Sequence, residues 1–259
     1  MALLSVRYYS KALVKATEAI VIFPENKGSG PFPVLYLLHG LSDDQSIWQR
    51  RTSIERYVQD LPLIVVMPDG GRGFYCDAEE GMAWETAIAR DLIDLIDSMF
   101  PTIAERAGRC IGGLSMGGYG AMKFALRYPD RFCSAHSHSG ALGFAHWPLS
   151  ADRGNAFAVE FTRVIGKSPV GGPNDLFALA SAVHPAARPA LSIDCGLSDH
   201  LISANEAFHA HLDEIGYEHK YTEYPGGHDW AYWDEHIKEA IGFHARGLKI
   251  SPVKESRLP

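Results

Sequence analysis

The sequence predicts an α/β protein with a mostly parallel sheet that is covered by helices on both faces. Short runs of apolar and β-branched residues alternate along the chain with stretches of helical periodicity. The chain has 259 residues, of which 46% are hydrophobic, so it can bury a large core. No internal repeat and no linker interrupt this pattern, so we expect one domain over residues 1–259.

The expected strands are short, apolar and bounded by turn signals. They cover residues 19–23, 34–38, 63–67, 109–113, 132–137, 190–195 and 220–224. The expected helices cover residues 48–58, 84–100, about 116–127, 202–215 and 230–245. The 84–100 segment has the clearest apolar stripe, and Pro101 ends it.

Composition and charge exclude several classes of protein. The net charge is −7 and no Lys/Arg cluster is present, which argues against binding to nucleic acid. The start of the chain lacks the features of a signal peptide, and no apolar run is long enough for a membrane span. Cys110 and Cys195 lie in strand-like runs and are interpreted as reduced core thiols, which favours a cytoplasmic location without membrane partners.

A candidate nucleophile lies between an expected strand and an expected helix. Residues 113–117, Gly-Leu-Ser-Met-Gly, fit the pattern G-x-S-x-G with Ser115 at its centre. A serine at such a tight turn is pushed out above the sheet, and small flanking residues let strand and helix pass closely. The strand before Ser115 and the helix after it are the context that this motif requires.

A serine nucleophile needs an imidazole base and a carboxylate that follow later in the chain. His228 lies in Pro-Gly-Gly-His, directly after the last expected strand. Asp199 follows the 190–195 strand, and Asp194 within that strand is the competing candidate. We favour Asp199, because a strand carboxylate would point into the sheet face and need a buried partner. The histidines in or beside other elements are expected to be solvated; they are His200, His209, His211, His219, His236 and His244.

The loop after the 34–38 strand is the expected source of an oxyanion donor. Gly40 lets the chain turn there, so the backbone N–H groups of Leu41 and Met116 are the predicted pair of donors. His136 and His138 could face the same way on one strand, as metal ligands sometimes do. No third ligand stands nearby in sequence, so we expect neither a metal nor another cofactor.

Residues 140–188 have no clean period and are rich in glycine, proline and aromatic side chains. A stretch of this length predicts an insertion over the active site rather than an ordinary connection. Within it, Trp147 is interpreted as a wall of an acyl pocket, and plain structural packing is the alternative. Residues 247–259 are expected to form a peripheral tail.

Taken together, these residues resemble the esterase D group of esterases and, within it, the bacterial tributyrin (acetyl) esterases. The matching segments are Pro33–Gly40, Trp48 with Arg51-Thr52 and Glu55-Arg56, Leu63–Pro68, Gly113–Gly120, Ser139–Ala141, Cys195-Gly196 with Asp199, and His228–Trp230 with Tyr232-Trp233. The resemblance implies the α/β-hydrolase fold, the same triad and oxyanion donors, and hydrolysis of short acyl esters without a cofactor. Residues 140–188 match too poorly to imply a substrate.

The leading prediction is therefore a serine carboxylesterase that acts on small acetyl or butyryl esters through an acyl-serine intermediate, with sugar or phenolic esters as variants. A thioesterase of the S-formylglutathione hydrolase type is the alternative, and an acyltransferase would have to exclude water. A non-catalytic protein that retains the fold is a third hypothesis, against which the complete set of catalytic residue types argues. The sequence is compatible with a homo-oligomer and leaves the natural ester open.

Overall fold

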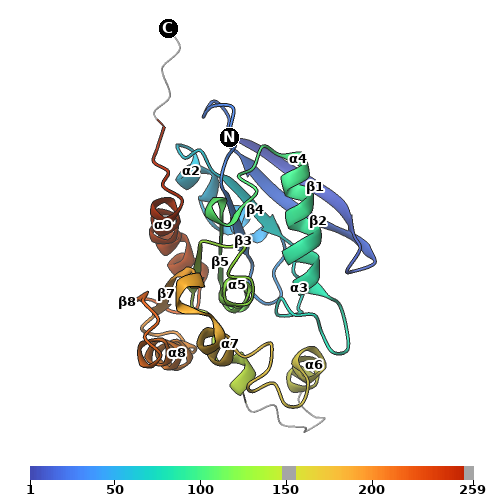
Figure 1. The fold of residues 1–259 in the computed structure, drawn as a ribbon, viewed down its shortest axis with the longest axis vertical. Helices are drawn as coiled ribbons and strands as arrows, with labels where there is room; N and C mark the ends of the chain where they lie inside the picture. The colour runs from blue at the N-terminus through green and yellow to red at the C-terminus, as the bar shows by residue number, and fades with distance from the viewer. Residues whose placement is uncertain (148–155, 254–259) are drawn as a thin grey trace.

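The sheet is the centre of the molecule in the computed structural model, which describes residues 1–147 and 156–253 (Figure 1). The described residues form one eight-stranded sheet in the order β1-β2-β4-β3-β5-β6-β7-β8. Strands β3 to β8 run parallel, whereas β2 pairs antiparallel with both β1 and β4. The strands are β1 (Ala2–Ser10), β2 (Lys15–Phe23), β3 (Val34–Leu38), β4 (Ile64–Pro68), β5 (Arg109–Leu114), β6 (Ser134–His138), β7 (Ala190–Gly196) and β8 (His219–Tyr224).

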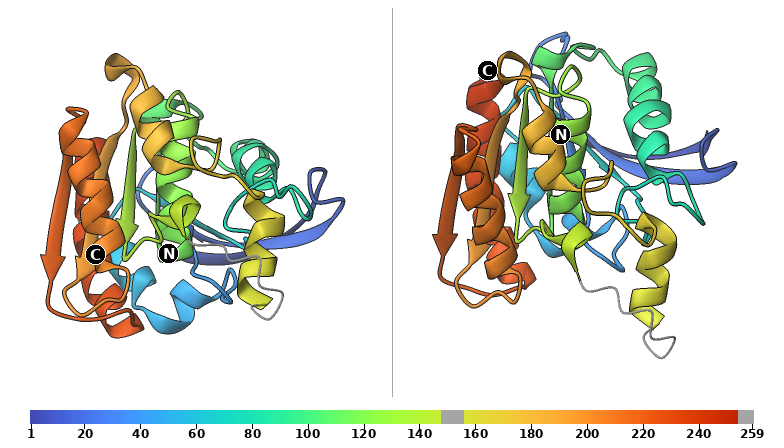
Figure 2. Two further views of the ribbon diagram at one scale, coloured as in Figure 1. Left: turned by 90° about the horizontal axis from the view of Figure 1, so that it is seen from below. Right: turned by 60° about the horizontal axis from the view of Figure 1, so that its bottom comes forward.

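Helices cover both faces of this sheet (Figures 1 and 2). They are α1 (Ile47–Arg51), α2 (Ile54–Val58), α3 (Trp84–Thr86), a π-helical turn (Ala87–Leu92), α4 (Ile93–Met99), α5 (Met116–Arg127), α6 (Ala156–Ile165), α7 (Leu176–Ala182), α8 (Ile202–Glu214) and α9 (Trp230–Gly247), with 3-10 turns at Arg106–Gly108, Phe144–His146 and Pro185–Ala187. Leu35 and Val65 pack with α1, α2 and α9, whereas Val34 and Tyr36 pack with α4 to α8. Successive residues of a strand therefore pack into the hydrophobic cores on opposite faces of the sheet, because side chains alternate along a strand.

The predicted α/β class is confirmed, and the elements differ from the prediction in detail. Strand β1 was not predicted, and the expected 48–58 helix is two helices. The break between them is fixed by α9, because Asp234 Oδ1 accepts a 2.9 Å bond from the Ser53 N–H. The expected 84–100 helix contains the π-helical turn, in which Asp91 accepts bonds from Ser10 Oγ and the Ala12 N–H of the first hairpin.

The segment from 140 to 188 is more regular than predicted. It contains α6 and α7, which have 10 and 7 residues and are too short to show a clear period in sequence. Residues 148–155 of this segment, and residues 254–259 of the predicted tail, lie outside the described part of the chain. Before that point, the tail lies against the body of the protein, where the Val253 N–H donates to the Asp60 carbonyl.

The inner face of α9 contains two histidines that were predicted to be solvated. His236 and His244 are buried, with 7% and 1% of their surface exposed, so that prediction was wrong. His236 stacks on Tyr224, and His244 Nδ1 lies 2.9 Å from Ser134 Oγ. All four cysteines are free thiols. Within the described residues, no helix combines the length and the apolarity needed to cross a bilayer.

Candidate active site

Ser115 is the single residue in the sharp turn between β5 and α5. Its backbone has φ +54° and ψ −116°, a conformation that L-residues rarely adopt. A Cβ on Gly113 would lie 2.6 Å from the carbonyl oxygen of Gly117, and one on Gly117 would lie 2.5 Å from that of Leu38. Both flanking glycines are therefore required by close backbone approach, as the motif predicts.

His228 lies in the loop between β8 and α9 and reaches back to the serine. Its Nε2 is 3.0 Å from Ser115 Oγ, although the two residues are 113 positions apart. The next residue, Asp229, caps α9 by accepting bonds from the Ala231 and Tyr232 N–H groups. The helix start thereby fixes where the preceding imidazole sits.

Asp199 holds the other side of the same imidazole. Its Oδ2 and Oδ1 lie 2.9 and 3.1 Å from His228 Nδ1, and its side chain is fully buried. Burial by itself would raise the pKa of Asp199, but hydrogen bonds from His228, the Leu201 N–H and Ser139 outweigh it and lower that pKa. The carboxylate is therefore ionised and directs Nδ1–H of His228 toward itself, which leaves Nε2 free to accept the serine proton.

The competing carboxylate, Asp194, lies lower in the sheet and does not contact His228. It bonds instead to His136, His138 and the Tyr232 hydroxyl. A carboxylate on a strand was expected to require buried partners, and these three residues are its partners.

The predicted oxyanion loop follows β3 and is tied down by His39. The Gly70 N–H donates to His39 Nε2 at 2.9 Å, so the ring proton is on Nδ1, which lies 2.7 Å from the Gly40 carbonyl oxygen. A Cβ on Gly40 would lie 2.6 Å from Leu114 Cδ1 and 3.8 Å from the Ser115 Cβ. The loop thus passes directly over the nucleophile.

The two predicted oxyanion donors flank the nucleophile from different elements. Leu41 lines the same pocket as Ser115 and His228. Met116 is the first residue of α5, where backbone N–H groups have no acceptor within the helix. Their role as oxyanion donors stays a prediction.

A pocket of about 530 Å³ opens at this point, with Ser115, Leu41 and His228 in its lining. Aromatic rings form much of its wall; they belong to Phe74, Trp147, Phe157, Trp230 and Trp233. The Trp147 ring stacks on Phe157 at 6.2 Å and meets Phe74 edge-on at 6.2 Å, so it is both a wall and a packed side chain. A larger hollow of about 700 Å³ lies beside Tyr217 and Phe243 and contains none of the predicted site residues.

The charged groups in the pocket are acidic. Asp43 and Asp229 line it, and the described lining residues include no lysine or arginine. Burial raises the pKa of Asp43. The ring of His200, whose side chain is 69% exposed, lies 4.5 Å from that of His228 at the mouth. The pocket therefore suits neutral groups better than anions.

Ser139 and Trp233 also belong to this site and were not predicted from the sequence. Ser139 follows β6 with φ +48°, and its hydroxyl hydrogen-bonds the Asp199 carboxylate. Trp233 Nε1 donates to Ser139 Oγ at 3.2 Å, and the Trp233 ring packs edge-on against His228. Both positions stand in segments that match the esterase group, which was the one signal available for them.

A nucleophile elbow on a mostly parallel sheet, with a base and an acid in later loops, defines a serine hydrolase of the α/β-hydrolase class. Residues 10–244 match the family described as "Putative esterase", and the chain belongs to that family. The chain is therefore a carboxylic ester hydrolase, as the resemblance implied.

Several relatives support this assignment. The chain is 31% identical to an acetyl esterase of Caldicellulosiruptor saccharolyticus, over 93% of this chain and 97% of that protein. Among solved structures, it is similar to a fluorophosphonate-binding serine hydrolase F of Staphylococcus aureus (33% identity, TM-score 0.85, 93% of this chain and 97% of that one). It is also similar to the S-formylglutathione hydrolase of the same organism (33% identity, TM-score 0.82, 93% and 98%).

Proposed function

We propose that this protein is a serine carboxylesterase that hydrolyses short acyl esters, acetyl and butyryl esters foremost. The observation that carries the proposal is the continuous chain of hydrogen bonds from the Ser115 hydroxyl through His228 to the buried carboxylate of Asp199. This chain faces an aromatic pocket beside a loop suited to stabilise an oxyanion.

In acylation, His228 Nε2 accepts the Ser115 proton as Oγ attacks the ester carbonyl carbon. The carbonyl oxygen becomes an oxyanion, which the Leu41 and Met116 N–H groups stabilise. The imidazolium then donates its proton to the departing alkoxide, so that the alcohol leaves and acyl-Ser115 remains. Asp199 stabilises the imidazolium throughout without taking its proton.

Deacylation repeats these steps with water as the nucleophile. Water gives a proton to His228 and attacks the acyl carbon, and a second oxyanion forms at the same donors. Its collapse breaks the bond to Ser115 Oγ, which recovers the proton from the imidazolium. The products are a carboxylic acid, an alcohol and the free enzyme.

The pocket favours uncharged esters. Its aromatic walls can contact an alkyl or a phenolic acyl group, and hydroxyl groups of a sugar could bond to Asp43. The similarity to the acetyl esterase supports short acyl chains. A structure titled as a ferulic acid esterase (25% identity, TM-score 0.80) supports the phenolic variant.

The second candidate is hydrolysis of S-formylglutathione, which the similarity to the S. aureus enzyme favours. Glutathione carries two carboxylates and one ammonium group, so its thioesters are net anions. The described pocket lining offers Asp43 and Asp229 and no cationic lysine or arginine to receive them. We therefore rank this activity second.

Covalent labelling with a fluorophosphonate tests the nucleophile. We expect stoichiometric labelling of the wild-type protein and of Ser181→Ala, an exposed serine on α7 that is not among the pocket-lining residues, but none of Ser115→Ala. A folded wild-type protein that is not labelled would overturn the enzymatic proposal in favour of the non-catalytic alternative.

The two substrate classes are separated by kcat/KM for S-formylglutathione and for p-nitrophenyl acetate and butyrate. We expect the aryl esters to be preferred. We also expect Asp43→Asn to raise kcat/KM for the thioester more than for the neutral esters, because it removes a negative charge from the pocket. A large preference for S-formylglutathione in the wild-type protein would reverse the ranking.

A further inference from the structure

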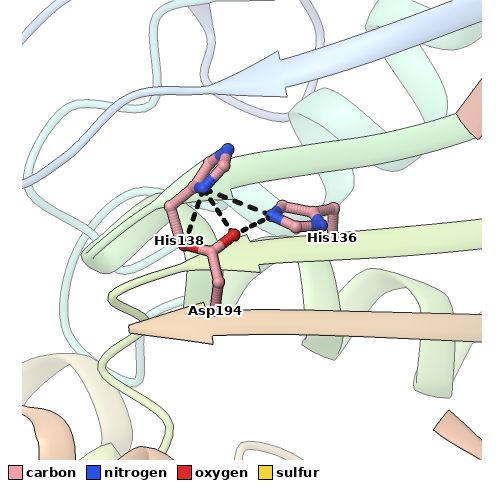
Figure 3. A group of neighbouring side chains, drawn as sticks. All are labelled: His136, His138 and Asp194. Atoms are coloured by element: carbon pink, nitrogen blue, oxygen red, sulfur yellow. Dashed lines mark hydrogen bonds and ion pairs between the residues drawn. The ribbon is translucent and has the colours of Figure 1, made fainter. Parts of the chain in front are cut away.

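A second cluster of catalytic-type side chains lies against strands β6 and β7 of the sheet (Figure 3). His136 and His138 are two residues apart on β6 and face the same side, and the strand register places Asp194 of β7 opposite His138. All three side chains are nearly inaccessible, with 3%, 0% and 2% of each residue exposed. The proposed ester hydrolysis uses none of them.

We propose that His136, His138 and Asp194 form a structural site for one divalent transition-metal ion, with Zn²⁺ the best match. No metal was predicted from the sequence, because no third ligand lies near the two histidines along the chain. The fold supplies that ligand, since β7 lies beside β6.

The three inward-facing atoms have the spacing of metal ligands. His136 Nε2 lies 2.7 Å from Asp194 Oδ2 and 3.2 Å from His138 Nδ1, which is 2.9 Å from the same oxygen. These atoms form a triangle with a circumscribed radius of about 1.7 Å, so an ion at a zinc–ligand distance of about 2.0–2.1 Å would lie about 1.1 Å from their plane. In a regular tetrahedron the ion would lie about 0.7 Å from that plane, so the three atoms would move apart by about 0.4 Å on binding. Two imidazoles with a carboxylate are ligands that zinc commonly takes.

The outer contacts suit a ligating carboxylate. The Tyr232 hydroxyl donates to Asp194 Oδ1 at 2.8 Å, which fixes the carboxylate; Oδ2 contacts both rings, and Oδ1 also lies 3.0 Å from His138 Nδ1. Hydrogen bonds to a ligand from outside the coordination sphere are typical of metal sites. The outer nitrogens, His136 Nδ1 and His138 Nε2, have no partner within the described residues, so the ring orientations depend on the inward-facing atoms.

A bound cation would also fit the negative charge of the Asp194 carboxylate. Within the described chain, the ion-pair partners of Asp194 are these two imidazoles and no lysine or arginine. If both inward nitrogens carry protons, two N–H dipoles converge 3.2 Å apart; if one does not, its lone pair faces the carboxylate. With both protons present each ring donates to the carboxylate, and a divalent cation would take the place of these protons and attract all three lone pairs.

Such an ion would join three elements that support the triad. His138 is followed directly by Ser139, Asp194 lies on the strand that leads to Asp199, and Tyr232 follows His228 in the first turn of α9. We therefore assign the ion a structural role. Serine hydrolysis does not use it, so the metal test and the esterase tests succeed or fail independently.

The experiment uses the full chain with any affinity tag removed. The protein is unfolded in a chelator and refolded with Zn²⁺, with Co²⁺ or without metal. We expect about one bound ion per chain by elemental analysis, a visible spectrum typical of tetrahedral Co²⁺, and a Tm raised by several degrees with metal.

Variants assign the ion to this cluster. His138→Asn and Asp194→Asn should lose it. His219→Asn should retain it, although it disrupts His209–Asp213–His219, a more exposed group whose possible ligand atoms also lie within 4.8 Å of one another. If the cluster variants do not fold, anomalous diffraction at the zinc edge from wild-type crystals decides, because it locates the ion directly.

Wild-type protein that binds less than a tenth of an equivalent after refolding with Zn²⁺ would overturn the proposal, and the cluster would then be a metal-free ion pair. Loss of the ion in His219→Asn but not in His138→Asn, or anomalous density away from the cluster, would also contradict it.

Discussion

The pair Asp199–His228 and the cluster of Asp194 with His136 and His138 differ in their exposure. Of these two groups, only the first opens to solvent. At the ends of the strands, Asp199 bonds to His228 at 2.9 Å; lower in the sheet, Asp194 bonds to His136 at 2.7 Å. The His228 side chain is 21% exposed and its second nitrogen faces Ser115. His136 is sealed beneath α9, and its second nitrogen has no partner among the described residues.

The comparison teaches that a hydrogen-bonded histidine–aspartate pair does not define a catalytic site. The pair becomes a base only where the free imidazole nitrogen faces a nucleophile in an open pocket. Where the pair is closed off, the same groups can contribute only to stability or hold an ion. Exchanging or removing members of each group tests this division.

The largest effect on turnover is expected for Asp199→Asn. The amide leaves the geometry nearly unchanged but does not hold His228 in the required tautomer or stabilise the imidazolium, so kcat should fall by about 10⁴-fold. The Tm should change by only a few degrees. Steady-state rates on p-nitrophenyl acetate and calorimetry check this, and near-normal turnover would remove Asp199 from the triad.

The matched change in the buried group, Asp194→Asn, should act on stability. It removes the buried negative charge and replaces one of the two acceptor oxygens, which His136, His138 and Tyr232 share, with an NH2 donor. The free energy of unfolding should therefore fall by about 3 kcal/mol. Denaturant titration measures it, and the folded fraction should retain kcat within a few-fold. A loss of turnover as large as that of Asp199→Asn would reverse the assignment of the two carboxylates.

Ser139→Ala is expected to have a moderate effect that depends on pH. Ser139 is one of the groups that lower the pKa of Asp199, so its removal raises that pKa. The ionised form of Asp199 exists above its pKa and is lost as pH falls, so activity relative to the wild-type protein should decrease toward acid pH. At neutral pH we expect a decrease of about tenfold, or about 1.4 kcal/mol. Ser181→Ala is the control, and a relative activity that does not change with pH would make Ser139 a packing residue only.

Trp147→Ala should have the smallest effect, a change in acyl preference. Truncation of this wall enlarges the pocket beside Phe74 and Phe157, so rates on butyryl and aryl-acyl esters should rise about 3–10-fold relative to acetyl esters. Relative kcat/KM values measure the change. Unchanged ratios would mean that Trp147 serves packing alone.

The elements that could be predicted from the sequence are those whose pattern is local. Strand β3 was predicted at its observed bounds, and Ser115, Asp199 and His228, which the structure brings into hydrogen-bond contact, could be proposed because each lies within four residues of the end of a strand. The π-helical turn was not predicted, because Asp91 leaves the regular helix for contacts with Ser10 and Ala12, about 80 residues earlier in the chain.

The rest of the site depends on contacts between segments that are far apart in sequence. Nothing near Ser139 indicates that its hydroxyl reaches Asp199, and nothing near His136 indicates that Asp194 lies beside it, 58 residues away. The burial of His244 likewise follows from which side of α9 meets the sheet. Composition and spacing describe single elements, whereas these roles arise from their pairing in three dimensions.

The distance along the chain between Ser115 and His228 has a consequence for synthesis. During translation, the nucleophile elbow leaves the ribosome 113 residues before its base, and domains acquire their contacts as successive segments emerge. The hydroxyl therefore stays chemically inert until the last loop and α9 have docked. Esterase activity that appears in a translation reaction would therefore report the completion of folding. Chains truncated before residue 228 should fold in part but have no esterase activity.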